Sequence, residues 1–310
     1  MKKSEETQKR HIICNIELIN KDIDKDEIVE ALQEKILKRS EQAVLDSKNP
    51  GCCYQFAKDI KGANVQALEQ VVLDSEDDML CYEFARDVEG ANIKALENFV
   101  LKGKSAYCCY LFARDIKGAN VQALEQVVVD SREADFCCLF AEHVKSDDID
   151  IKALEQVILE SKDPEYCLRF ARCVKSDDVD IKSLAKFVLK SKNPSWNYEF
   201  ARDVEGANKK AHEKIVLKRK NPYCCYEFAK DVKGADIQAH EKIVLNDKFA
   251  YIWDSFISDV EGANIKAFEQ AVLKTKDSDI INAFYNKIAK ENPKQKKLIM
   301  NPRIKEIKNY

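Results

Sequence analysis

Tyrosines and basic residues recur in pairs along this chain of 310 residues. In each pair the base follows the tyrosine by four positions, which places both side chains on one face of a helix. Arginine suits carboxylates and phosphates, and tyrosine stacks on nucleic-acid bases or anchors protein interfaces. The candidate binding residues, which we call the Tyr/base ladder, are Tyr54, Lys58, Tyr82, Arg86, Tyr110, Arg114, Tyr198, Arg202, Tyr226 and Lys230, with Arg172 continuing the series without a tyrosine.

Alternatively, the residues of this ladder only stabilise the stack of repeats and bind no partner. On a helical wheel the ladder lies away from the apolar stripe, so we expect both members of each pair at the surface. An aspartate follows most of the bases directly, and these aspartates could pair with bases of neighbouring repeats. They are Asp59, Asp87, Asp115, Asp203, Asp231 and Asp259.

Four aspartates form a second candidate site, in the segments KSDDIDIK at 145–152 and KSDDVDIK at 175–182. Asp147, Asp148, Asp177 and Asp178 are expected to project from adjacent loops as an acidic edge. This edge is either solvated, a docking site for a basic partner, or a weak site for a divalent ion. The EF-hand pattern does not fit, because its central glycine is missing.

His212 and His240 stand where the other units hold a core leucine, each within the sequence HEKIV. The second histidine of the H-E-x-x-H zinc motif is missing, which argues against a metalloprotease. We expect two neutral, partly buried histidines, with a polar pocket or a pH-sensitive spot as the alternative.

A repeat of 28 or 30 residues positions all these groups. Self-similarity at this period is typical of solenoids, in which each unit contacts only its neighbours. The repeat predicts an all-α, right-handed α-solenoid of about nine or ten stacked two-helix repeats. Its most regular position is a core phenylalanine, at Phe56, Phe84, Phe112, Phe140, Phe170, Phe200, Phe228 and Phe256.

Each unit reads as two short helices joined by a tight turn. In residues 49–75, Asn49 and Pro50 open a first helix that runs to about Ile60, Gly62 stops it, and Asn64 caps a second helix. We expect N-terminal capping helices and a degenerate first repeat in 1–47, eight αα-hairpin repeats in 48–280, and a C-terminal capping helix with a basic tail in 281–310.

The repeat resembles the α-solenoids of the tetratricopeptide, Sel1-like and HEAT class, although the W-x-x-L-G-x-x-Y pattern of tetratricopeptide repeats is missing. The phrase FARDVxGAN(I/V)xALExxVL also resembles repeats of uncharacterised bacterial and phage proteins, over residues 48–280. The first resemblance implies a binding scaffold. The phage resemblance implies, as a narrower alternative, an inhibitor of a bacterial defence complex.

The net charge of −3 and the lack of a long apolar run predict a chain that neither crosses nor binds a membrane. Twelve cysteines lie mostly three or four residues before the core phenylalanine, which predicts small buried side chains in a reducing cytoplasm. No C-x-x-C pair is present, so no zinc site is expected.

The function we expect is that of a non-enzymatic interaction protein that presents an extended concave surface to a macromolecule. A protein is the expected partner, and nucleic acid bound through the Tyr/base ladder is the alternative. We expect no catalytic residues, no cofactor, no metal and no small-molecule substrate, because phosphate-binding glycine loops and nucleophile motifs are missing from the sequence.

Overall fold

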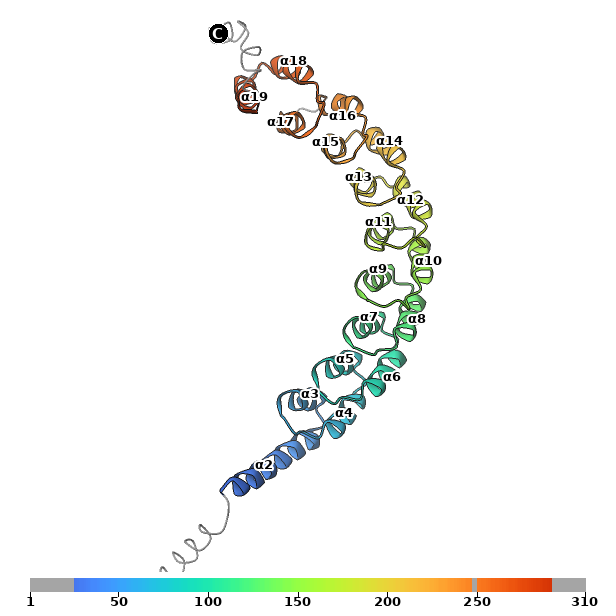
Figure 1. Ribbon diagram of the computed structural model, residues 1–310, viewed down its shortest axis with the longest axis vertical. Coiled ribbons are helices and arrows are strands. Elements are labelled where there is room, and N and C mark those ends of the chain that lie inside the picture. Colours follow the sequence, from blue (N-terminus) through green and yellow to red (C-terminus); the bar gives the residue numbers. More distant parts are fainter. Residues whose placement is uncertain (1–24, 247–249, 292–310) are drawn as a thin grey trace, which may run out of the picture. The chain divides into compact units, whose positions relative to one another are not determined.

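A computed structural model describes residues 25–246 and 250–291, and every regular element in that part of the chain is a helix (Figure 1). The predicted all-α, solenoid-like architecture is therefore confirmed. The helices are α2 (Lys25–Ser47), α3 (Pro50–Asp59), α4 (Val65–Leu73), α5 (Asp78–Asp87), α6 (Ile93–Gly103), α7 (Ala106–Asp115), α8 (Val121–Ser131), α9 (Ala134–His143), α10 (Ile151–Ser161), α11 (Pro164–Cys173), α12 (Ile181–Lys190), α13 (Pro194–Asp203), α14 (Lys209–Arg219), α15 (Pro222–Asp231), α16 (Ile237–Val244), α17 (Ala250–Asp259), α18 (Ile265–Thr275) and α19 (Ser278–Glu291).

The capping residues form the contacts that their types predict. The side chain of Asn49 accepts a hydrogen bond from the amide of Cys52 at 3.1 Å, at the start of α3. Asn64 accepts from the amide of Ala67 at 3.2 Å, at the start of α4. Such caps satisfy amides that a helix leaves free at its first turn, so each hairpin is specified locally.

The glycine of the turn between the two helices does not directly follow the C-cap residue of the first helix; one residue separates them. Helix α3 ends at Asp59, Ile60 adopts an extended conformation, and Gly62 follows with a φ of 86°. Residues with a side chain are strained at such a φ, which explains the glycine. The same conformation recurs at Gly90, Gly118, Gly206, Gly234 and Gly262.

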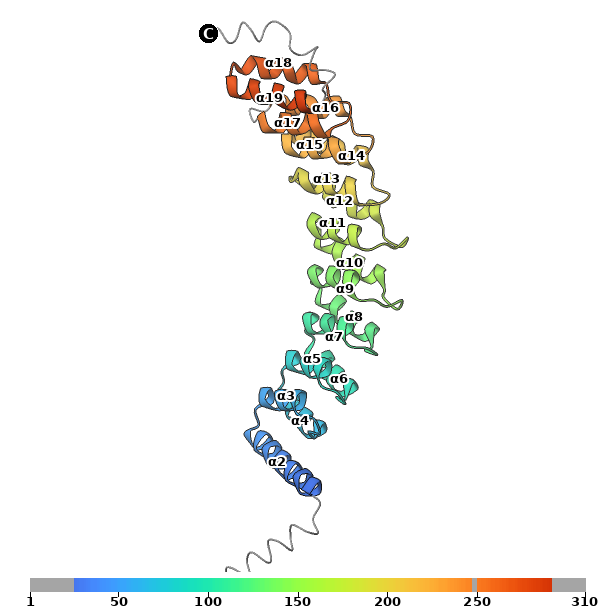
Figure 2. The same ribbon diagram turned by 60° about the vertical axis from the view of Figure 1, so that its left-hand side comes forward.

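The chain packs as two compact units, each described here by itself. One comprises the described residues up to Ser131 together with Lys145–Asp148; the other comprises Arg132–Val144 and the described residues from Ile149 onward. Within each unit the odd-numbered helices stack on one another as a first-helix layer, and the even-numbered helices form a second-helix layer (Figures 1 and 2). The first-helix layer is the more closely packed of the two.

Eight helix pairs run from α3–α4 to α17–α18, with a single helix at each end of the described chain. Of the range 1–47, where a degenerate first repeat is expected, the described part is one continuous helix, α2, in which Glu41 makes the contact that a second helix makes in the other repeats. Within residues 25–291 as described, Val29, Leu32 and Ile36 of α2 are exposed and Phe56 is half-buried, and no described first helix covers them. At the other end, Phe284 of α19 is fully buried. The right-handed twist and the three-part division of the chain stay predictions.

The core follows the repeat, and the cysteines belong to it. Nine of the eleven described cysteines are buried, and all eleven are free thiols. The thiol of Cys53 lies 3.9 Å from the carbonyl oxygen of Val44, and the thiol of Cys109 lies 4.0 Å from that of Val100. At the same repeat position, the indole of Trp253 donates to a carbonyl at 2.9 Å. Cysteine is thus a small buried side chain with a weak donor for the preceding second helix.

Burial should make most of these thiols unreactive. Burial raises the pKa of Cys81, Cys109 and Cys225 to about 12, which leaves little reactive thiolate near neutral pH. Cys52 is exposed, contrary to the expectation that it lies inside, and Cys173 is half-buried. We expect these two to be labelled first by a thiol reagent in the native protein, followed by peptide mapping. Rapid labelling of Cys81 or Cys109 would contradict the packing described here.

Candidate binding surface on the first helices

The second repeat shows how one rung of the Tyr/base ladder is built. The hydroxyl of Tyr82 donates to Asp115 of the next repeat at 2.5 Å. Arg86 donates to the Tyr82 hydroxyl at 3.1 Å, and its guanidinium lies 5.1 Å from the centre of the tyrosine ring. Two further bonds, at 2.7 and 2.9 Å, join the same guanidinium to Asp87. The ladder is thus a network that runs from one repeat to the next.

The other complete rungs repeat these contacts. In the first repeat, Tyr54 donates to Asp87 at 2.5 Å, and Lys58 lies 3.1 Å from the Tyr54 hydroxyl and 2.9 Å from Asp87. In the compact unit that contains the described residues from Ile149 onward, Tyr198 donates to Asp231 and Tyr226 donates to Asp259. Arg114 bonds Asp115 and Tyr110, Arg202 bonds Asp203 and Tyr198, and Lys230 lies over the ring of Tyr226.

Four of the five tyrosines of the ladder are buried and Tyr54 is half-buried, so the expectation that they lie at the surface was wrong. Tyr82 is 2% exposed, and Tyr110, Tyr198 and Tyr226 are also buried. A helix inside a stack has a neighbour on either side, so its apolar surface is wider than the stripe on its own wheel. The Tyr54 ring, for example, lies 6.4 Å from the ring of Phe84 in the next repeat.

The bases remain accessible, with 39% of the Arg86 side chain and 37% of the Arg202 side chain exposed. Hydrogen bonds from Arg86, Tyr54 and Lys58 hold the pKa of Asp87 well below its usual range, with Arg86 as the largest cause. Asp87 is therefore ionised at neutral pH, and it offsets the charge of Arg86. Burial, together with the bond to Asp115, raises the pKa of the Tyr82 hydroxyl, which stays protonated as a donor.

The ladder changes character in α9 and α11. Arg172 has no tyrosine beside it and lies 3.6 Å from Glu199 and 4.0 Å from Asp203. Arg169, one turn earlier on the same helix, pairs with Glu142 at 3.0 Å and with Asp135 at 2.9 Å. Ion pairs between side chains thus replace the tyrosine network here.

The aspartates of the predicted acidic edge are exposed, as expected. The amide of Asp148 donates to Ser146, and the amide of Asp178 donates to Ser176, both at 3.2 Å. The carbonyl of Asp178 also accepts a bond from Lys152. Asp147 and Asp148 belong to one compact unit and Asp177 and Asp178 to the other, so a shared acidic edge stays a prediction.

The two histidines are fully buried and lie in successive repeats. Nδ1 of His212 lies 3.0 Å from Oδ1 of Asn197, and its ring stacks on Phe200 at 4.7 Å. Nε2 of His240 lies 3.3 Å from Glu213. Burial lowers the pKa of His212 to about 4 and also lowers that of His240, which Glu213 partly offsets. Both are neutral at physiological pH, as predicted.

A row of buried glutamates is a feature that the sequence reasoning missed. The carboxylate of Glu69 accepts a bond from the amide of Asn92 at 2.7 Å, so it caps the second helix of the next repeat. The visible signal was the recurring Glu of the ALE triplet, 23 residues before the next capping residue. The same contact joins Glu41 to Asn64, Glu97 to Asn120, Glu155 to Asp180, Glu213 to Asp236, and Glu241 to Asn264.

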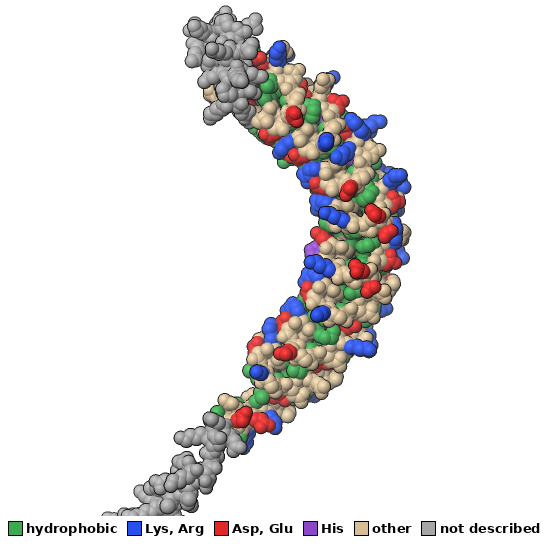
Figure 3. All heavy atoms as spheres, in the orientation of Figure 1, with side chains coloured by type: hydrophobic (Ala, Val, Ile, Leu, Met, Phe, Trp, Pro, Cys, Tyr) green, Lys and Arg blue, Asp and Glu red, His purple; other side chains and the backbone are tan. Residues whose placement is uncertain are grey.

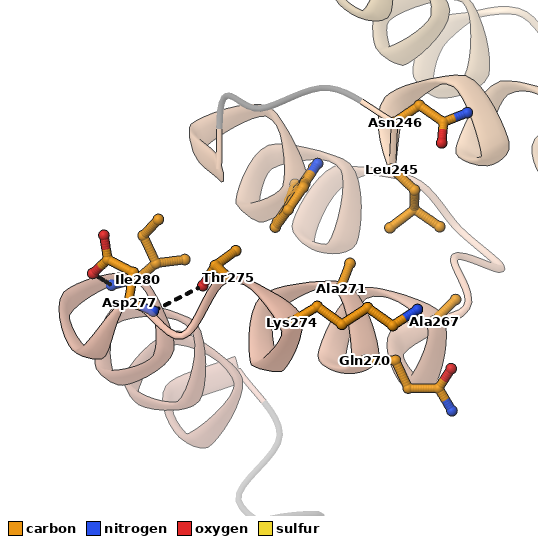
Figure 4. Close-up of a pocket in the computed structure, with 10 residues that line it drawn as sticks. Leu245, Asn246, Ala267, Gln270, Ala271, Lys274, Thr275, Asp277 and Ile280 are labelled. Carbon is orange, nitrogen blue, oxygen red and sulfur yellow. Dashed lines mark hydrogen bonds between the residues drawn. The ribbon is translucent and has the colours of Figure 1, made fainter. Parts of the chain in front are cut away.

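A pocket near the C-terminal end lies among α16 to α19 (Figure 4). Its polar lining residues include Asn246, Gln270, Lys274 and Asp277. The amide of Asp277 donates to Thr275 at 3.2 Å, a contact that shapes the turn between α18 and α19. Among the described residues, no group of three or more His, Cys, Asp or Glu side chains could hold a metal ion.

The remaining observations concern membrane spans, the C-terminal tail and similarity to known proteins. Among the described helices, none combines the length and apolar character needed to span a bilayer. The side chains of the predicted basic tail, from Lys287 to Tyr310, lie outside the described residues. No protein family, curated protein or solved structure matches this chain.

Proposed function

We propose that this chain is a non-enzymatic scaffold whose first-helix layer binds a protein partner through the bases of the Tyr/base ladder. The observation that carries the proposal is that each arginine is held by hydrogen bonds and still has N–H donors without a partner among the described residues. Arg86 uses three of the five N–H bonds of its guanidinium on Tyr82 and Asp87, which leaves two for a partner. Arg114 and Arg202 are held in the same way.

A held arginine is a better anchor than a mobile one. Association normally costs the ordering of long side chains at the interface, and here the aspartate and the tyrosine ring have already ordered them. Interfaces are enriched in arginine and tyrosine, and Tyr223 stands exposed on α15, five residues before Phe228. Closer packing among the first helices supports the first-helix layer as the concave side of the stack in each unit.

Charge favours a protein over nucleic acid at this surface. Each arginine is bonded to an ionised aspartate, as Arg114 is to Asp115 at 2.6 Å, so a rung carries little net positive charge. Nucleic-acid affinity depends on net positive charge that replaces counterions along the phosphates. The free thiols support placement of the protein in a reducing cytoplasm.

A triple exchange of Arg86→Lys, Arg114→Lys and Arg202→Lys tests the proposal. The first repeat already holds Lys58 at this position, bonded to both Tyr54 and Asp87, so the fold should be kept. Lysine has three N–H bonds where arginine has five, so donors available to a partner are lost, and we expect partner affinity to fall about tenfold or more. The measurement is quantitative capture of crosslinked partners from source cells after nuclease treatment.

The matched control exchanges Lys94→Arg, Lys152→Arg and Lys266→Arg, which lie exposed on the second helices. This variant changes side-chain chemistry to the same extent and should bind normally. Full partner capture by the first variant, with an unchanged melting temperature, would show that the ladder only holds the repeats together.

A further inference from the structure

Two neighbouring second helices carry parallel rows of lysines. On α12 the row is Lys182, Lys186 and Lys190, and on α14 it is Lys210, Lys214 and Lys218. All six side chains are exposed, and both helices belong to the same compact unit, where they pack against each other. We call these six residues the lysine rows; Figure 3 shows Lys and Arg side chains over this part of the molecule.

The spacing of the lysine rows is regular. Residues four apart lie on one helix face, about 6 Å apart along the axis. Packed helices lie roughly 8–10 Å apart, so the two rows form a grid of positive charge. Lys209, Arg219 and Lys220 are also exposed and add to the same face.

This positive charge is not neutralised locally. Within the described residues, Lys210 pairs with the buried Glu213 at 3.5 Å, and the other five lysines have no acidic group within ion-pair distance. Like charges four residues apart destabilise a helix, and Lys209 and Lys210 stand at the N-terminal end, where the helix dipole disfavours a cation. Lys190 and Lys218 lie in the last turns, where the dipole favours a cation, so the repulsion is strongest in the first two turns of each helix.

The other repeats show that the fold does not require these lysines. In the second helix of the first repeat the same three positions hold Gln66, Gln70 and, at the C-cap of α4, Asp74. Ala185 of α12 also stands where most second helices hold the buried glutamate, so α12 itself contains no acidic residue. This pair of repeats therefore concentrates positive charge, and α12 lacks the glutamate that would bond the capping residue of the next second helix.

We propose that the lysine rows bind the phosphate backbone of a double-stranded nucleic acid. Lysine is depleted at protein interfaces, where arginine and aromatic residues dominate, but it is a common point-charge ligand of phosphate. Single-strand binding uses exposed aromatic rings for stacking, whereas Phe187 and His212, the aromatic side chains of α12 and α14, are half-buried and buried. The lysine rows therefore fit a duplex whose phosphates are contacted and whose bases are not read. They lie on the second-helix layer, whereas the Tyr/base ladder lies on the first-helix layer.

The test is fluorescence anisotropy with a labelled DNA duplex of mixed sequence, titrated at several salt concentrations. The affinity of the wild-type protein should fall steeply with salt. In a plot of the logarithm of the association constant against the logarithm of the salt concentration, each neutralised phosphate should add about −0.9 to the slope. The sixfold variant replaces Lys182, Lys186, Lys190, Lys210, Lys214 and Lys218 with glutamine. It should bind about 100-fold or more weakly at about 50 mM salt, with a shallower slope.

A matched control replaces six exposed lysines at equivalent positions of the other second helices with glutamine: Lys94, Lys102, Lys152, Lys242, Lys266 and Lys274. Its net charge equals that of the sixfold variant, and it should retain most of the affinity. Equal loss in both variants would overturn the proposal, because overall charge would then explain binding. Circular dichroism of both variants checks that each is folded.

Three other probes separate a duplex from other anions. A single strand of the same sequence, poly-glutamate and vesicles rich in phosphatidylserine should each bind more weakly than the duplex at the same salt. Tighter binding to any of them, or no binding of the duplex at about 50 mM salt, would overturn the assignment. The Arg→Lys variant of the ladder should bind the duplex normally. The duplex titration therefore tests the lysine rows separately from the proposed protein-binding surface.

Discussion

Replacing Phe84 with alanine is expected to lower the free energy of unfolding by about 3–5 kcal/mol. The side chain is fully buried, and the ring of Tyr54 packs near it from the preceding repeat. A cavity at this point should loosen α3 to α7, because each repeat of a solenoid contacts mainly its neighbours. Hydrogen exchange should show lost protection there, while α13 to α18 of the other compact unit keep theirs.

The control for this change is Tyr223→Ala. Tyr223 is 56% exposed at the start of a first helix, so its truncation removes an aromatic ring without opening a cavity. Its expected cost is below about 1 kcal/mol. Uniform loss of protection along the whole chain in the Phe84 variant would show that the repeats fold as one cooperative block.

Acid is expected to weaken this protein through His212. Because the amide oxygen of Asn197 accepts from Nδ1–H, the neutral ring carries its proton on Nδ1, and Nε2 is buried without a partner. The folded pKa of about 4 lies below the value of about 6.5 for an unfolded chain. The contribution of neutral His212 is thus complete above pH 6.5 and is lost as the pH falls toward 4. The loss amounts to about 3 kcal/mol.

The repeats supply the matched variant for this prediction. Asn197→Cys with His212→Leu introduces the residues that the first repeat holds at these two positions, the buried Cys53 and Leu68. The urea-unfolding stability of this variant, compared with wild type at pH 7 and pH 4, should be less sensitive to acid by about 3 kcal/mol. Equal loss in the two proteins would show that other groups cause the acid sensitivity. His240 and Glu213 are unchanged in both proteins.

Sequence alone determined the unit of this fold. An N-cap contact such as that of Asn64 with Ala67 spans three residues, and the turn at Gly62 depends on the backbone of one residue. The buried phenylalanines follow from the period of the repeat. These features are local, so they could be derived without knowing which surfaces meet.

The tertiary structure decided how the candidate residues are used. Tyr82 is buried because the next repeat covers the side of the helix that its own wheel leaves open. The Tyr82–Asp115 bond joins residues 33 positions apart, and the Glu69–Asn92 bond joins residues 23 apart. Such contacts depend on how one hairpin stacks on the next, and helical periodicity within a hairpin carries no information about that geometry.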